Sequence, residues 1–275
     1  MYSHVIRGIR PFVAAIIHMT CRASGHHNQR VRASASATFA IEMWRAAIVL
    51  LVADKARLSV PLDIFLVASG FLSLHWKVIS DASPWRLAAG LYDYESGRLF
   101  CWSTFLLPYS CANAHRFQTQ REYLGHLFSL LVIVAYKATL PITSVTSSYQ
   151  WVNDNTGAIS WVNKHKCSSS AGSFASMAVS QLNILSNVWA AESIHIPGST
   201  MGEIDAMSRL EAQSDHLLAF PTLTPATYVE VQSPSVTALF ERCNPAMVVA
   251  TPAEHHTLFS DVSTLINDII ASFSS

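Results

Sequence analysis

Residues 189–210, W-A-A-E-S-I-H-I-P-G-S-T-M-G-E-I-D-A-M-S-R-L, hold the strand, turn and helix signals on which the predicted fold depends. Residues 190–196 predict a short strand, a Pro-Gly pair ends it, and residues 201–210 predict a helix. Asp205 lies inside this helix. The segment therefore places one carboxylate just beyond a strand and a tight turn.

The chain upstream of this segment predicts a mixture of strands and helices. Three apolar runs at 77–81, 86–94 and 98–105 predict antiparallel strands joined by short turns. A helix at 118–137, a strand at 150–153, a helix ending near residue 162 and a helix at 173–189 follow. This order predicts an α/β domain with a mixed five-stranded sheet, three antiparallel strands and then two parallel ones, flanked by helices.

We predict three parts of the chain. Residues 76–212 form the α/β domain, and residues 1–75 precede it as a helical and irregular segment. Residues 213–275 contain five prolines and predict a poorly ordered extension of unknown role. Hydrophobic residues make up 51% of the 275 residues, which is enough to bury a large core.

Charge and cysteine content restrict the partners and the compartment. The 18 basic and 18 acidic residues balance, so any nucleic-acid binding must depend on local contacts. The five cysteines never form a C-x-x-C pair, which favours a reducing compartment and argues against structural zinc. The apolar runs are shorter than the roughly 20 residues of a membrane span, and no clear signal peptide begins the chain. We expect an intracellular protein, in the cytoplasm or nucleus, that is not secreted and has no membrane partner.

Four acids stand in distinctive positions on the predicted elements. Asp81 follows the first strand, Glu122 lies near the start of the long helix, and Asp154 follows the fourth strand. Asp205 lies in the last helix of the α/β domain. Carboxylates on rigid elements are the ligands with which phosphodiester-cleaving enzymes hold two Mg²⁺ or Mn²⁺ ions. These four acids are therefore candidate metal ligands and catalytic residues for such an enzyme.

Each acid also has a simpler structural explanation. Asp81 could begin an Asx-turn, and Glu122 could form a capping box with Thr119. Asp154 could cap the helix that follows it, and Asp205 could be an exposed helix residue. Only a fold that brings the acids together distinguishes the two interpretations.

Four motifs resemble, in order, those of the ribonuclease H domain of retroelement polymerases, in particular the retrotransposon type. They are D-A-S-P-W-R at 81–86, R-E-Y-L-G at 121–125, D-N-T-G-A-I-S-W-V-N-K at 154–164, and H-I-P-G at 195–198 followed by Asp205, Ser208 and Arg209. The resemblance implies the ribonuclease H fold, two Mg²⁺ or Mn²⁺ ions on the four acids, and cleavage of the RNA strand of an RNA–DNA hybrid. Residues 9–61 resemble, more weakly, the connection to a polymerase. No Y-x-D-D motif occurs, so the chain looks like a piece of a pol polyprotein whose reverse transcriptase domain is a possible partner.

The resemblance also has departures. Met201 stands where the family has Asn, and Ile204 stands where it has Ala. These changes keep open an inactive ribonuclease H-fold remnant that binds nucleic acid or protein, while a DNA strand transferase would carry a final Glu in place of Asp205. For a hybrid, we expect contacts from polar and basic residues near the third motif. They are Asn155, Thr156, Lys164 and Lys166.

Overall fold

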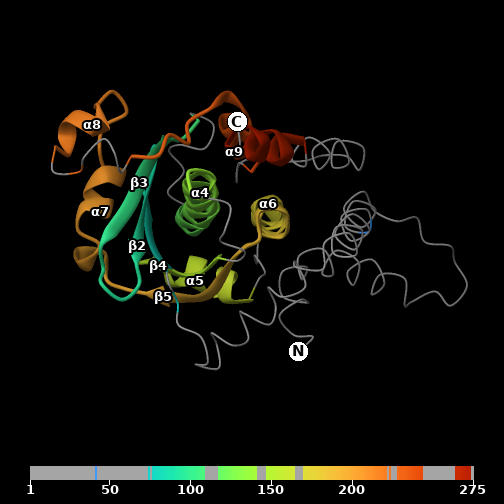
Figure 1. The fold of residues 1–275 in the computed structure, drawn as a ribbon, viewed down its shortest axis with the longest axis horizontal. Helices are drawn as coiled ribbons and strands as arrows, with labels where there is room; N and C mark the ends of the chain where they lie inside the picture. Colours follow the sequence, from blue (N-terminus) through green and yellow to red (C-terminus); the bar gives the residue numbers. More distant parts are fainter. Residues whose placement is uncertain are drawn as a thin grey trace, which may run out of the picture.

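The computed structural model describes residues 41, 74, 76–108, 117–140, 147–164, 170–221, 223, 228–243 and 264–273. Within these residues the chain forms one mixed sheet with helices on both faces (Figure 1). Nearly all of the predicted 1–75 segment lies outside the described residues, as does Lys166. Among the helices that are described, none has both the length and the apolar character that crossing a membrane requires.

The sheet has five strands among the described residues, in the spatial order β3-β2-β1-β4-β5. They are β1 (Trp76–Ala82), β2 (Arg86–Asp93), β3 (Leu99–Leu106), β4 (Ser147–Asn153) and β5 (Val188–His195). β1, β2 and β3 are antiparallel neighbours, whereas β4 is parallel to β1 and β5 is parallel to β4. The predicted mixed sheet is confirmed. β5 begins earlier than expected, so Trp189 belongs to a strand and not to the end of a helix.

The helices lie on the two faces of the sheet. They are α4 (Gln118–Ala138), α5 (Thr156–Lys164), α6 (Ser170–Ser186), the 3-10 turn η4 (Gly198–Thr200), α7 (Glu203–Ser208), α8 (His216–Ala219) and α9 (Pro234–Arg242). α4, α6 and α9 lie on one side of the sheet, and α7 and α8 lie on the other (Figure 1). α7 packs on β1 and β2, which places it across the sheet from α4.

Part of the C-terminal extension belongs to the main core. Val236, Leu239 and Phe240 of α9 are fully buried, and the Phe240 ring centroid lies 4.5 Å from that of Phe105 on β3. The prediction that residues 213–275 are a poorly ordered extension is therefore wrong for α9. Prolines indicated irregular structure, but Pro234 stands in the first turn of the helix, where its missing N–H loses no hydrogen bond.

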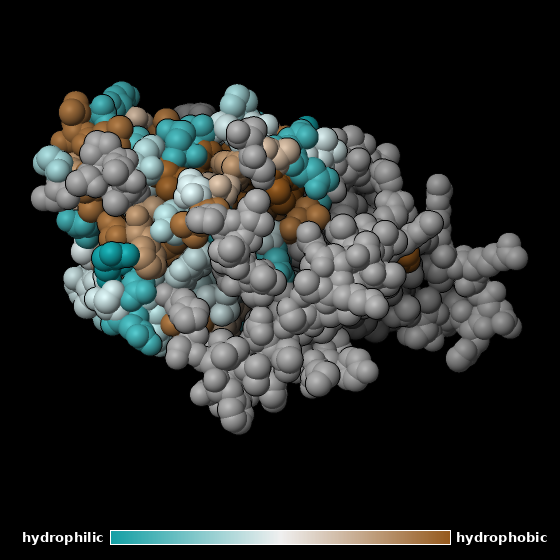
Figure 2. Space-filling view, viewed as in Figure 1, coloured by the Kyte–Doolittle hydropathy of each residue, from teal (hydrophilic) through white to brown (hydrophobic). Residues whose placement is uncertain are grey.

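α8 contributes little apolar burial of its own. Leu218 is 79% exposed, and apolar side chains gather on the surface in the region of α8 (Figure 2). Two other features hold the helix. The Asp215 side chain caps its first turn, and the His216 ring packs edge-on at 5.7 Å from Trp102 of β3.

The D-A-S-P-W-R motif forms a turn that hydrogen-bonds to the chain after α7. The Ser83 hydroxyl accepts a hydrogen bond from the Arg86 N–H at 3.0 Å, which closes the turn between β1 and β2. The Trp85 indole donates to the Leu210 carbonyl at 2.6 Å. The buried Arg86 guanidinium donates to the carbonyls of Glu211, Ala212 and Ser214 at 3.1, 3.5 and 3.3 Å. The turn thus holds the segment that follows α7 in place.

Replacing Arg86 with Met should lower the free energy of unfolding by about 1–3 kcal/mol, because three carbonyls would lose a charged donor. Urea denaturation measures this change. Arg98→Met is the matched control, since Arg98 is exposed and should leave stability nearly unchanged. Equal stability of the two variants would show that the Arg86 contacts do not stabilise the fold.

Candidate metal centre

The strand register brings two of the predicted acids to the same end of the sheet. β1 and β4 are parallel neighbours, and Ile79 is paired with Val152. Asp81 and Asp154 each come two residues later, at the carboxyl ends of these strands. Parallel strands end at a common edge, so their following residues lie close together.

Glu122 reaches the same edge from α4. Gly125, one turn along the helix, faces β1, and a Cβ there would lie 3.3 Å from the Ser80 hydroxyl oxygen. This close approach brings the start of α4 to the end of β1 and buries Glu122, which is 2% exposed. The predicted capping box is wrong, because Phe117 is the N-cap of α4 and Thr119 lies inside the helix.

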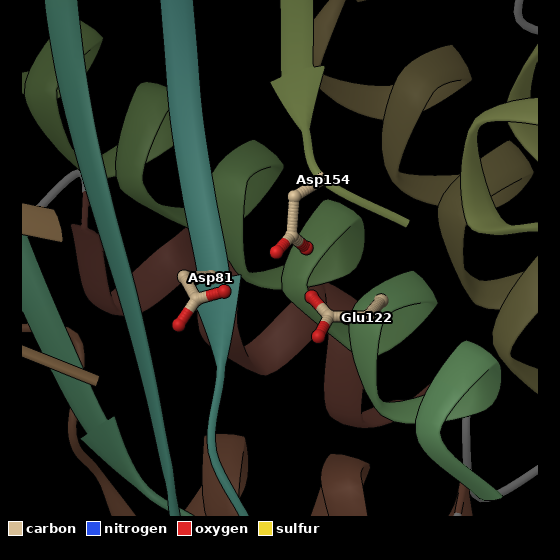
Figure 3. Close-up of side chains that lie close together, drawn as sticks. All are labelled: Asp81, Glu122 and Asp154. Atoms are coloured by element: carbon tan, nitrogen blue, oxygen red, sulfur yellow. The ribbon is translucent and has the colours of Figure 1, made fainter. Parts of the chain in front are cut away.

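Asp81, Glu122 and Asp154 meet in one cluster. One carboxylate oxygen of each lies within 4.8 Å of the other two. Figure 3 shows the three carboxylates turned toward one another from β1, α4 and the end of β4. No nitrogen or sulfur ligand takes part in this cluster, and three hard oxygen donors at this spacing fit Mg²⁺ or Mn²⁺. The simpler structural explanations of these acids do not require them to meet.

Neighbouring amides hold the Glu122 carboxylate in place. The Gln118 amide donates to its Oε1 at 2.5 Å, and the Asn153 amide donates to its Oε2 at 3.0 Å. The Asn153 amide also donates to the Ser80 carbonyl at 2.8 Å, which ties β4 to β1 beside the cluster. Sequence reasoning missed Gln118 and Asn153. Their only signal was position, one helical turn before Glu122 and one residue before Asp154.

Residues that follow β5 lie against the two aspartates. The Ser208 hydroxyl of α7 donates to the Asp81 carboxylate and lies 2.9 Å from the Asp205 carbonyl oxygen. A Cβ on Gly198 would lie 2.7 Å from Asp154 Oδ2, so this turn leaves space for the carboxylate. Asp154 does not cap α5, because Asn155 accepts from the Ala158 N–H at 2.9 Å.

Asp205 does not join the cluster of three. Its carboxylate accepts from Arg209 Nε at 2.8 and 2.9 Å and from Nη2 at 2.6 Å, which is a bidentate ion pair. Its side chain is 26% exposed, so it is neither buried with the other acids nor fully in solvent. It is near enough to raise the pKa of Asp81 by charge repulsion. The structure thus brings together three of the four predicted ligands.

Burial and mutual repulsion disfavour the ionised cluster. Burial, followed by the charge of Asp81, raises the pKa of Glu122 from 4.5 to about 8. Burial is also the main cause that raises the pKa of Asp81 from 3.8 to about 6, against the hydrogen bond from Ser208. A bound cation would offset both causes, since it attracts the charged carboxylates.

A cavity of about 580 Å³ opens beside the cluster. Its lining includes the three acids, the Ser83–Trp85 turn, Gln118, Arg121, Asn155, Ser208 and Arg209. Of the predicted nucleic-acid contacts, Asn155 lines this cavity, Thr156 begins α5, and Lys164 ends α5 with an exposed side chain. The motifs contained Arg121 and Ser208, but their spacing did not reveal these contacts.

No family model, curated protein or solved structure matches the chain.

Without divalent metal, the free energy of unfolding should fall as the pH rises from about 4 to 8. The native carboxyls of Asp81 and Glu122 hold protons more tightly than unfolded ones, and the rising pH removes those protons from the native state. Urea midpoints at pH 5 and pH 8 in EDTA measure the fall. Glu122→Gln should reduce it, Mg²⁺ should reverse it at pH 8, and the exposed-residue control Glu95→Gln should leave it unchanged. A flat wild-type profile would contradict the electrostatic account.

Gly198→Ala should fold normally but bind divalent metal about tenfold or more weakly. The new methyl would collide with Asp154 Oδ2, which is the free end of a side chain and can move aside without disturbing the backbone. Titration calorimetry with Mg²⁺ or Mn²⁺ and thermal denaturation separate the two effects, with Asp154→Asn as the reference for a lost ligand. Metal affinity equal to that of the wild type would show that this turn does not position Asp154.

Proposed function

We propose that this chain is a metal-dependent endonuclease of the ribonuclease H type, which hydrolyses the RNA strand of RNA–DNA hybrids. The observation that carries the proposal is the cluster of Asp81, Glu122 and Asp154 beside an open cavity. The D-A-S-P-W-R, R-E-Y-L-G and D-N-T motifs supply these acids, and the topology of the described sheet is compatible with that fold.

The donor set favours metal-assisted hydrolysis over other acid–base chemistry. A divalent cation held by the cluster would supply an activated water and stabilise the departing oxygen of a phosphodiester. The chain's own residues keep the ligands in position, which limits their reorganisation when a cation binds. Gln118 and Asn153 orient Glu122, and Ser208 orients Asp81.

The hybrid substrate is supported by the motifs and by the polar side chains among those that line the cavity. The chain has no net charge to attract nucleic acid from a distance, so binding must depend on groups in the cavity. Hydroxyl and amide groups recognise the shape and the 2′-hydroxyls of a hybrid in its minor groove. Asn155 lines the cavity next to the acids and carries such an amide group.

One observation favours a second function. Asp205 is paired with Arg209 and stands apart from the other acids. Met201 and Ile204, the residues that depart from the family pattern, are buried on either side of the start of α7. A chain whose fourth acid stays in this ion pair would bind a hybrid without cutting it.

Incubating the protein with Mg²⁺ or Mn²⁺ and a hybrid labelled on its RNA strand tests the proposal. We expect cleavage of the RNA strand, and a loss of at least about 100-fold in rate for Asp81→Asn and for Asp154→Asn. Asp93→Asn is the matched control, because Asp93 pairs with Trp76 at the opposite end of β1 and should leave the rate unchanged.

Three results would contradict the proposed activity. A folded, metal-loaded protein that binds the hybrid without cutting it would favour the inactive binding module. Cleavage of duplex DNA in preference to the hybrid would favour the strand-transferase class. Equal activity of Asp81→Asn and the wild type would show that the cluster takes no part in cleavage.

A further inference from the structure

Arg121 is a buried cation in the wall of the candidate site. It precedes Glu122 on α4, is 1% exposed, and lines the same cavity as the three acids. Its Nη2 donates to the Gln118 side-chain oxygen at 2.5 Å. Among the described residues, its Nε and Nη1 have no hydrogen-bond partner. A guanidinium has five N–H donors, so much of its hydrogen-bonding capacity is unused.

This arrangement lowers the stability of the fold, so a structural role does not account for it. Burial lowers the pKa of Arg121, and the charge of Glu122 acts in the opposite direction, yet a guanidinium stays protonated in proteins. No ion pair with a carboxylate satisfies it among the described residues. Buried charged donors without partners destabilise a fold. A structural arginine would be expected to have its donors satisfied, as Arg86 has for most of them.

Gln118 holds the Arg121 guanidinium beside the acids, and no direct hydrogen bond between Arg121 and the three acids is present among the described residues. Its side-chain oxygen accepts from Arg121, and its side-chain nitrogen donates to Glu122 Oε1 at 2.5 Å. One amide therefore anchors a cation and an anion next to each other. The Nε and Nη1 donors of Arg121 have no acceptor among the described residues and are available to a bound group.

We propose that Arg121 binds an anionic phosphoryl oxygen of a nucleic-acid strand lying in this cavity. The assignment rests on the proposed function for the identity of the strand. Three carboxylates repel a phosphate, and a guanidinium beside them offsets that repulsion. Guanidinium groups hydrogen-bond phosphate oxygens strongly, and more so where water is excluded. Arg121 thus acts as a binding residue for the strand next to the metal ligands.

The test measures binding of a short, fluorescently labelled RNA–DNA hybrid by anisotropy in EDTA, across a series of salt concentrations. EDTA prevents metal-dependent cleavage, so failure of the hydrolytic proposal does not affect the result. We expect Arg121→Met to weaken binding about tenfold and to reduce the slope of log K against log salt by about 0.7–0.9, the value for one lost phosphate contact. Arg121→Lys should retain part of the slope. The exposed-arginine control Arg98→Met should match the wild type.

Thermal denaturation separates this role from a structural one. Because Arg121 has unsatisfied buried donors, Arg121→Met should melt no lower than the wild type. A large fall in melting temperature with an unchanged salt slope would overturn the proposal, as would no detectable binding by the wild type. Stabilisation of the wild type by inorganic phosphate, with no slope change for the hybrid, would also overturn it, by assigning Arg121 to free phosphate. A changed slope without RNA cleavage in Mg²⁺ would support the Arg121 site and contradict only the hydrolytic activity.

Discussion

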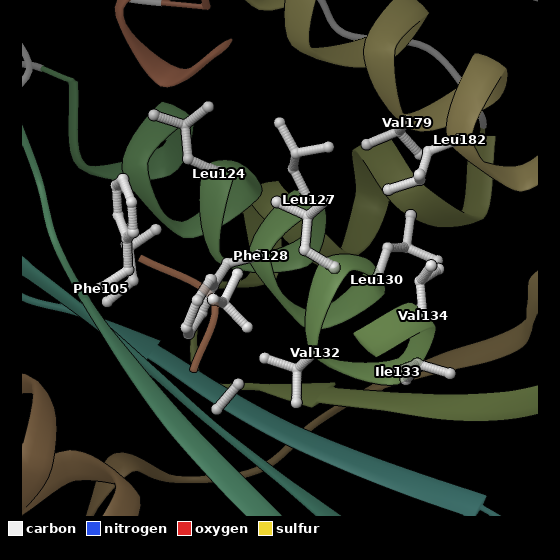
Figure 4. Close-up of a cluster of buried hydrophobic side chains, with 14 of the residues drawn as sticks. Phe105, Leu124, Leu127, Phe128, Leu130, Val132, Ile133, Val134, Val179 and Leu182 are labelled. Atoms are coloured by element: carbon white, nitrogen blue, oxygen red, sulfur yellow. The ribbon is translucent and has the colours of Figure 1, made fainter. Parts of the chain in front are cut away.

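The burial of α4 on nearly all sides is the constraint on which the site depends. From Arg121 to Ala135 every residue of this helix is buried. Its apolar side chains point toward the sheet and Phe105 on one side and toward Val179 and Leu182 of α6 on another (Figure 4). Such a helix cannot rotate or slide without exposing apolar surface or opening cavities. Its first turns are therefore held firmly at the carboxyl ends of β1 and β4.

Buried polar groups gather in the first turns of α4. Glu122 and Arg121 are both buried there, and Gln118 hydrogen-bonds both. Burial has a cost for each of these two groups. It raises the pKa of Glu122, and it leaves donors of Arg121 without a hydrogen-bond partner among the described residues. A cation bound among the carboxylates would favour the charged form of Glu122, and a phosphate bound beside Arg121 would accept hydrogen bonds from its free donors. Apolar burial in the core of the domain offsets the cost of these buried charged groups at its edge.

The predictable parts of the fold and of the site came from short-range signals. Alternating apolar runs and turn residues located β1 to β4 within a few residues, and an acid directly after a strand pointed to its carboxyl end. These short-range signals failed where contacts between residues far apart in the chain determine the local structure. The T-x-x-E pattern suggested a cap for α4, but the helix begins earlier and Glu122 faces the sheet. The proline content indicated poor order, but the apolar face of α9 packs into the core against Phe105.

The sequence by itself determined most of the elements between residues 76 and 208 and that Asp81 and Asp154 stand at the ends of strands, because periodicity and turn chemistry act over a few residues. The tertiary structure decided which acids meet. Glu122 joins the aspartates because Gly125 lets α4 approach β1, whereas Asp205 turns to Arg209, four residues away on its own helix. Distances between residues far apart in the chain are set by the packing of helices on the sheet, and no local pattern encodes them.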